Sequence, residues 1–98
     1  MNIKAAIFDI DGTLVPVGTD LLPARTAAAL RGLQAKGVPV IVATGRARFA
    51  AMAILNGFVP DYLVAVCGAQ TTDGAGRTLA ERCMTSEEMY ALVDFFED

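Results

Sequence analysis

Three short apolar runs, at residues 3–8, 38–43 and 62–66, are the clearest feature of the hydrophobic pattern. Each run is apolar on both of its alternating faces, which is typical of a parallel strand buried between helices. A strand with one face in water would instead alternate apolar and polar residues. The pattern therefore predicts three buried strands of an α/β fold, with helices on both sides of the sheet.

Helical patterns fill the two gaps between these runs. Pro23 suits the first helical position, Leu30 and Leu33 share one face, and Gly37 follows the end of the segment. A second helix is expected between the turn at residues 44–46 and the third apolar run. The order strand–helix–strand–helix–strand predicts parallel strands joined by right-handed crossovers in a doubly wound sheet.

The last third of the chain changes character. Residues 69–83 contain two extended segments around the Gly-rich turn at residues 73–76, which predicts a hairpin. A helix is expected to begin at Thr85, because Glu88 three residues later completes a capping box. The apolar face of this helix would carry Met89, Leu92, Val93 and Phe96.

The change of pattern places a domain boundary near residue 68. We assign residues 1–68 to a partial core domain and residues 69–98 to the beginning of an α+β domain. Hydrophobic residues make up 54% of the chain, and the mean hydropathy of +0.46 is high for 98 residues. A domain of this size buries only about 60–70% of its unfolded surface. Part of the apolar content is therefore expected to face a partner subunit or a missing part of the chain.

Charge and cysteine content exclude several classes of function. The net charge of −3 gives no basic footprint for nucleic acid. No window approaches the ~20 apolar residues of a membrane span, and the N-terminus does not resemble a signal peptide. Cys67 and Cys83 form no metal-binding cluster, which favours buried, reduced thiols in a cytoplasmic protein. The absence of His excludes His-based catalytic triads.

Two carboxylates, Asp9 and Asp11, follow the first apolar run and lead directly into Gly12 and Thr13. Because Gly12 makes a turn there, both acids are expected at the carboxyl end of a strand, where open α/β sheets hold their ligands. One carboxylate can attack a phosphate ester while the other moves protons, with a divalent cation between them. The amides of Gly12 and Thr13 could face phosphate oxygens. Both acids could instead be simple turn residues.

Thr44, Gly45 and Arg46 follow the second apolar run. Since neighbouring parallel strands end at the same edge of a sheet, Thr44 is expected near Asp9, and a phosphoryl group could be held between them. Gly45 would leave the amide and hydroxyl of Thr44 open to this group. Arg46 begins a helix, where backbone amides favour anions, although it could equally be a solvated surface residue. This second cluster favours a phosphate site over the turn interpretation of the two acids.

These motifs resemble those of the haloacid dehalogenase superfamily of phosphohydrolases, and in particular its Cof-type branch. Residues 9–14, Asp-Ile-Asp-Gly-Thr-Leu, look like the first family motif, and residues 43–46, Ala-Thr-Gly-Arg, like the second. The resemblance implies a Rossmann-like core with an inserted α+β cap, and a phosphatase acting on small phosphorylated metabolites such as sugar phosphates. It also implies that Asp9 is the nucleophile, Asp11 the general acid/base and Thr44 the phosphoryl ligand. Mg²⁺ would bind the Asp9 carboxylate and the Asp11 carbonyl.

The chain departs from the Cof-type pattern in two respects. Cys67 stands where that branch has Asn, which changes the substrate contact expected there. The Lys and Gly-Asp motifs that complete the family's site follow the cap, and the 98 residues do not reach them. Neither Lys4 nor Lys36 can replace that Lys, because both are expected at the opposite edge of the sheet. A second hypothesis is therefore a catalytically incompetent, truncated fragment.

The same comparison of motifs predicts self-association. In the family's strand order the first strand is central, and a fourth parallel strand pairs beside it. These residues contain no such strand, so an apolar edge is expected to lie open. We therefore expect a homodimer or higher oligomer, formed by strand addition or swapping.

Overall fold

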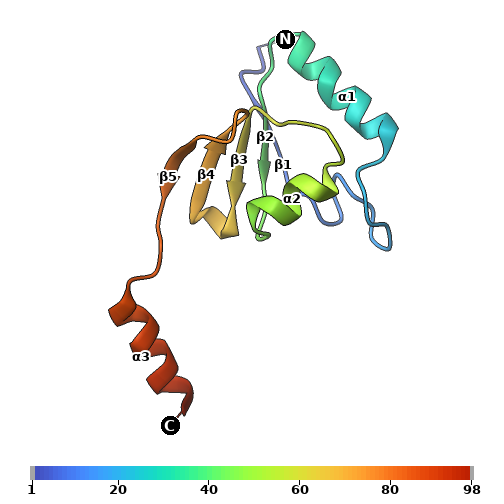
Figure 1. The fold of residues 1–98 in the computed structure, drawn as a ribbon. Helices are drawn as coiled ribbons and strands as arrows, with labels where there is room; N and C mark the ends of the chain where they lie inside the picture. The colour runs from blue at the N-terminus through green and yellow to red at the C-terminus, as the bar shows by residue number, and fades with distance from the viewer. Residues whose placement is uncertain (1, 98) are drawn as a thin grey trace.

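The computed structural model of the chain describes residues 2–97, with side chains described as far as Phe95. Its strands form one five-stranded sheet in the order β1-β2-β3-β4-β5 (Figure 1). The strands are β1 (Ala6–Phe8), β2 (Val40–Ala43), β3 (Tyr62–Ala65), β4 (Gln70–Asp73) and β5 (Thr78–Glu81). The helices are α1 (Ala24–Ala35), α2 (Arg48–Ile54) and α3 (Ser86–Glu97), with a short 3-10 turn, η1 (Val66–Gly68), after β3.

The predicted strand–helix–strand–helix–strand core is confirmed. β1 pairs with β2, and β2 with β3, both in parallel, so that Phe8, Val42 and Leu63 lie side by side across the sheet. The strands are shorter than the apolar runs, because the first residues of the runs at 3–8 and 38–43 precede the sheet pairing. Gly37 ends the α1 segment with φ +80°, as expected of a residue after a helix.

The helices cover one face of the sheet, and the expectation of helices on both faces is wrong for the described residues. Leu30 of α1 and Ala51 of α2 share a single buried cluster with Val42 and Leu63. The chain crosses from β1 to β2 and then from β2 to β3 in the same direction along the sheet. Two right-handed crossovers in one direction place both helices on the same side.

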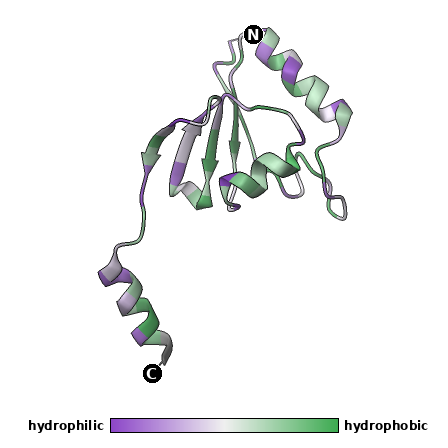
Figure 2. Cartoon of the chain, viewed as in Figure 1, coloured by the Kyte–Doolittle hydropathy of each residue, from purple (hydrophilic) through white to green (hydrophobic). Residues whose placement is uncertain are grey.

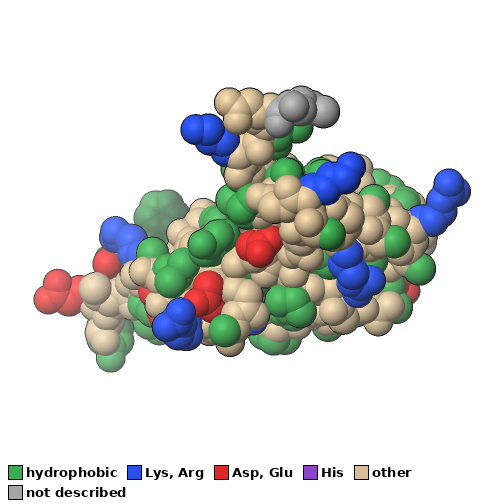
Figure 3. Space-filling model, turned by 90° about the horizontal axis from the view of Figure 1, so that it is seen from above, with side chains coloured by type: hydrophobic (Ala, Val, Ile, Leu, Met, Phe, Trp, Pro, Cys, Tyr) green, Lys and Arg blue, Asp and Glu red, His purple; other side chains and the backbone are tan. Residues whose placement is uncertain are grey.

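The other face of the sheet is open and carries apolar side chains. Ile7, Ile41 and Tyr62 form one row across β1, β2 and β3. Ile7 is 68% exposed, Tyr62 is also exposed and Ile41 is half-buried. Hydrophobic side chains reach the surface elsewhere as well, scattered among charged ones in the view of Figure 3. The apolar excess of the composition is therefore visible as uncovered surface.

The predicted hairpin exists, and it extends the core sheet. β4 pairs antiparallel with β3, and β5 pairs antiparallel with β4. The hairpin turn is organised by Asp73, whose Oδ1 accepts hydrogen bonds from the amides of Ala75 at 3.0 Å and Arg77 at 2.9 Å. A single sheet thus runs across residue 68, and the division into two domains at that residue stays a prediction.

The last helix stands apart from the sheet, joined to β5 by residues 82–85 (Figure 1). Its predicted N-cap is confirmed, since the Glu88 amide donates to Thr85 Oγ1 at 3.1 Å. The face that the sequence marks as apolar is exposed at Met89, Leu92 and Val93, and Figure 2 shows green segments on this isolated helix. The Phe96 side chain lies outside the described ones. Among residues 2–97, no helix has the length and apolar character to cross a membrane.

Candidate active site

Three loops meet at the carboxyl edge of the parallel strands. Asp9 directly follows β1, Thr44 follows β2, and Val66 begins the turn after β3. Because these strands are parallel and adjacent, their carboxyl ends lie at one edge of the sheet. The topology therefore gathers the two sequence motifs, as predicted.

The first loop turns sharply after Asp9. Asp9 is exposed, and its Oδ1 accepts a hydrogen bond from the Ile10 amide at 2.8 Å. Gly12 adopts φ +78°, a conformation that glycine enters without a steric penalty. Its amide donates to Val15 O at 2.9 Å, and the Thr13 amide donates to Ile10 O at 3.2 Å. Both amides thus donate hydrogen bonds within the loop. Their contact with phosphate stays a prediction.

The second loop places the buried Thr44 hydroxyl at the carboxyl edge of the sheet. Thr44 is only 6% exposed, and its Oγ1 accepts a hydrogen bond from the Arg46 amide at 3.1 Å. That bond leaves the hydroxyl proton available for donation to an anion. Gly45 lies against the third loop, since a Cβ at this position would lie 3.2 Å from Cys67 Sγ and would have to displace the thiol slightly. The turn therefore presents Thr44 in a fixed orientation beside the third loop.

A bidentate ion pair joins the first two loops, and no local pattern in the sequence predicts it. Arg46 Nε donates to Asp11 Oδ2 at 3.0 Å, and Arg46 NH2 donates to Asp11 Oδ1 at 2.8 Å. The hydrogen bond from Arg46 holds the pKa of Asp11 below its ordinary value, and Asp11 in turn raises the pKa of Arg46. The two motifs predict both residues at the site but do not pair them, and they direct Asp11 at a leaving group.

The third loop is strained. Val66 and Cys67 both have φ +51°, which is unusual for any residue with a Cβ and especially for a β-branched one. Two hydrogen bonds hold this loop against the second: the Val66 amide donates to Arg46 O at 3.0 Å, and the Cys67 amide to Thr44 O at 3.1 Å. Strained backbone of this kind clusters at functional sites. Gly68 is the only nearby sequence signal for such a turn.

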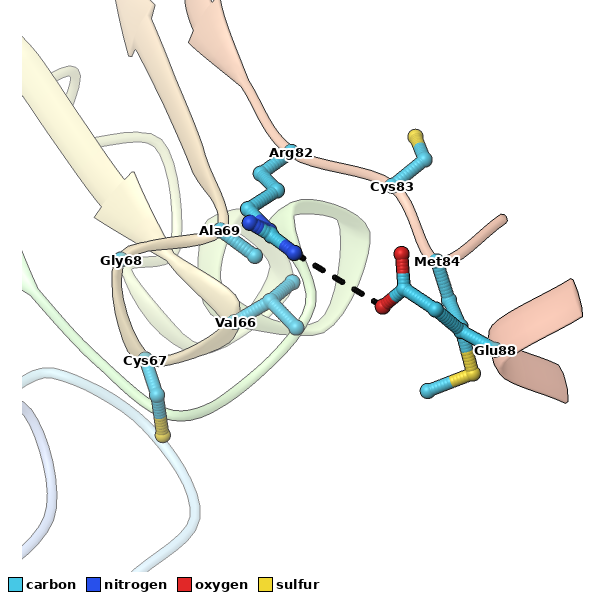
Figure 4. A pocket seen from close by; sticks show the side chains of 8 residues that line it. All are labelled: Val66, Cys67, Gly68, Ala69, Arg82, Cys83, Met84 and Glu88. Atoms are coloured by element: carbon cyan, nitrogen blue, oxygen red, sulfur yellow. Dashed lines mark ion pairs between the residues drawn. The ribbon is translucent and has the colours of Figure 1, made fainter. Parts of the chain in front are cut away.

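Cavities border this edge of the sheet. A cavity of about 300 Å³ lies beside Asp11. It is lined by Asp11, Gly12, Val15, Pro16, Val17, Gly18 and Thr19. A second cavity, of about 520 Å³, lies between η1 and the start of α3 (Figure 4). It is crossed by an ion pair of 3.7 Å between Arg82 and Glu88. The second cavity connects the third loop with the beginning of α3.

The two cysteines border the second cavity, and the expectation that they are buried is wrong. Cys67 and Cys83 are both exposed free thiols, and in Figure 4 their sulfur atoms point in opposite directions. The Cys83 thiol donates to Glu81 Oε1 at 2.9 Å, and this bond raises its pKa. Cys67 lies in the turn after β3 and Cys83 follows β5, and both are outside the buried hydrophobic cluster.

The donor set at the edge fits part of a magnesium site. The Asp9 carboxylate and the Asp11 carbonyl are hard oxygen ligands, the kind that Mg²⁺ prefers. Within residues 2–97, no group of three His, Cys, Asp or Glu side chains gathers to hold a metal ion. Lys4 precedes β1 and Lys36 follows α1, both at the amino edge of the strands. Of the ligands of such a site, the described residues offer the Asp9 carboxylate and the Asp11 carbonyl.

Comparisons with known proteins identify the class to which this fold and its two motifs belong. Residues 6–98 match the sequence profile of the haloacid dehalogenase-like hydrolases. The chain belongs to this family. The expected superfamily and its Rossmann-like α/β core are thus confirmed.

Solved structures and a curated relative agree with this assignment. A haloacid dehalogenase-like hydrolase of B. subtilis superposes with a TM-score of 0.82 at 28% identity, over 97% of this chain and 33% of that one. The HAD subclass IIB sugar phosphatase BT4131 superposes with a TM-score of 0.73 at 32% identity, over 96% of this chain and 37% of that one.

The curated relative is a much longer protein. A Streptococcus pyogenes serotype M6 protein, provisionally named a bifunctional phosphatase/peptidyl-prolyl cis-trans isomerase, is 30% identical over 97 residues. The alignment covers 99% of this chain and 21% of that protein. The chain thus spans about a third of the structures and about a fifth of the curated relative.

Proposed function

We propose that this chain carries the nucleophile and phosphate-binding loops of a Mg²⁺-dependent phosphatase that acts on a small phosphorylated metabolite such as a sugar phosphate. The supporting observation is the meeting of Asp9, Asp11 and the Thr44–Arg46 turn at one sheet edge, tied together by the Arg46–Asp11 ion pair. The sugar-phosphate class draws support from the 32% identical sugar phosphatase.

The reaction follows from the chemistry of the two carboxylates. An Asp9 oxygen attacks phosphorus, the bond from phosphorus to the ester oxygen breaks, and that oxygen takes a proton that Asp11 has first taken up from water. In the second step Asp11 removes a proton from water, and the water oxygen attacks the phosphorus of the aspartyl-phosphate. The bond between phosphorus and Asp9 then breaks, which releases phosphate and restores both acids.

The other site residues would bind and orient the phosphate. Thr44 can donate its hydroxyl proton to a phosphoryl oxygen from the base of the site. Arg46 carries a planar guanidinium that suits phosphate geometry. Mg²⁺, held by the Asp9 carboxylate and the Asp11 carbonyl, would offset phosphate charge when bound.

The test is magnesium-dependent hydrolysis of an aryl phosphate by the 98-residue chain. Any turnover by the chain alone should be far below that of a complete relative, lost in Asp9→Asn and lowered about 10²–10⁴-fold in Asp11→Asn, the range for general acid–base catalysis. Asp20→Asn is the matched control, because Asp20 is an exposed acid in the loop before α1. It should leave turnover unchanged.

A folded sample without turnover would favour the second candidate, a catalytically incompetent fragment that retains the fold. The available metal ligands favour this alternative, since the described residues gather no complete metal site. Binding of phosphate without hydrolysis would identify that state, because binding needs only the loops after β1 and β2.

The surroundings of the protein are part of the proposal. Two exposed free thiols suit a reducing compartment, and we place the protein in the cytoplasm. The uncovered row at Ile7 and the outer edge of β1, which pairs with no other strand among residues 2–97, suit association with a second copy.

A further inference from the structure

The ion pair between Arg46 and Asp11 uses the side chains of two residues that the proposed reaction needs elsewhere. Its two parallel N–H···O bonds, of 2.8 and 3.0 Å, engage both oxygens of Asp11. A carboxyl group held in this way has neither oxygen directed at the ester oxygen of a bound substrate. The guanidinium that would meet phosphate is turned to the same partner. In the described arrangement neither side chain is placed for its proposed role.

The backbone of Arg46 is held by two hydrogen bonds, while its side chain is bonded, among the described residues, to Asp11 alone. The Arg46 amide donates to Thr44 Oγ1 at 3.1 Å, and its carbonyl accepts from the Val66 amide at 3.0 Å. The paired side chains are 44% exposed for Arg46 and 57% exposed for Asp11. An ion pair this exposed contributes little and can be exchanged at small cost. Phosphate offers the guanidinium a bidentate partner of higher charge.

We propose that Arg46 is a positioning residue that holds Asp11 in its resting orientation and exchanges that carboxylate for the phosphate of the substrate. On exchange, Asp11 is released to turn toward the leaving group. This inference rests on the proposed phosphatase function. It assigns to one arginine both the capture of phosphate and the release of the acid, so that Asp11 becomes free only when phosphate is present.

The proposed exchange predicts a different pattern of phosphate affinities from simple charge repulsion between Asp11 and phosphate. We would titrate inorganic phosphate, with Mg²⁺, into the chain, Asp11→Asn, Arg46→Gln and the double variant, following the Thr44 and Gly45 amides by NMR. Without its competitor, Arg46 should bind phosphate about two- to fivefold more tightly in Asp11→Asn, the value of an exposed pair. In the Arg46→Gln background the same substitution should give a smaller gain.

Simple repulsion between Asp11 and phosphate predicts the reverse order. An Asp11 carboxylate stripped of its guanidinium partner repels phosphate more strongly, so its removal would help more in the Arg46→Gln background than in the wild type. That order of gains would overturn the proposal. Arg25→Gln, which removes one exposed charge from α1, is the matched control and should leave the affinity unchanged.

The Arg46 Nε–H signal gives a direct second reading. Phosphate should move this signal toward its position in Asp11→Asn, because both conditions break the pair. If phosphate moves the Thr44 amide but leaves the Arg46 signal in place, the exchange is wrong and the phosphate site stands. If phosphate moves neither signal, the proposed phosphate site itself is wrong, and the exchange with it.

Discussion

Asp61 ties the beginning of β3 to the beginning of β2, and its removal should destabilise the fold. Its Oδ2 accepts hydrogen bonds from the Val40 amide at 2.7 Å and from Gln34 Nε2 at 3.0 Å. Its own amide donates to Val40 O at 2.8 Å. One side chain thus joins α1, β2 and the loop before β3. The perturbation is Asp61→Ala, which deletes the acceptor and keeps the backbone bond.

The magnitude follows from what each donor loses. Val40 is 0% exposed, so its amide would be left buried without an acceptor, at a cost of about 1–3 kcal/mol. Gln34 loses less, because its Nε2 still donates to Val59 O at 3.0 Å. We expect Asp61→Ala to lower the free energy of unfolding by about 2 kcal/mol. Asp61→Asn keeps an acceptor oxygen and should cost less than about 1 kcal/mol.

Urea unfolding followed by circular dichroism measures this difference. With an m-value of about 1–3 kcal/mol/M, the midpoint of Asp61→Ala should fall by roughly 1 M at an unchanged slope. Asp20→Ala removes an exposed acid and should stay within about 0.5 kcal/mol of the wild type. A loss within that same margin for Asp61→Ala would refute the reasoning. An equal loss in Asp61→Asn would show that the negative charge of Asp61, and not its acceptor oxygen, stabilises these contacts.

Three further outcomes are expected. The Arg77 amide lowers the pKa of Asp73, so the stability this carboxylate contributes is present above its ordinary value of 3.8 and lost as the pH falls below it. Asp73→Asn should therefore flatten the acid limb of stability against pH, and an unchanged limb would contradict this. The chain should sediment as a dimer or larger, and Ile7→Lys on the open face should shift it to monomer while Val17→Lys in an exposed loop does not. A monomeric wild type would dismiss self-association. Val66→Asn should raise the free energy of unfolding by about 0.5–1 kcal/mol, because Asn tolerates a positive φ better than Val. Urea midpoints test this, and an unchanged midpoint would show that the turn is not strained.

Local features of this protein could be predicted from its sequence. The apolar runs mark the strands because a buried strand excludes polar residues from both faces. The Thr85 cap is confirmed by its hydrogen bond, and the hairpin after Asp73 by its pairing, since both depend on neighbouring residues. The motif at Asp9 and the motif at Thr44 could be placed at one edge because parallel strands share their direction.

The elements, the parallel core and the family to which the motifs belong could thus be predicted from local patterns. The face of the sheet that the helices cover depends on the packing of the fold, since an apolar run shows that a face is apolar and not which segment lies against it. The packing also brings Arg46 into contact with Asp11, 35 positions earlier in the chain. That contact depends on the directions of two loops, which are set by the Gly12 turn and by the bonds from the third loop. No local pattern of residues encodes these directions, because they arise from contacts between segments far apart in the sequence.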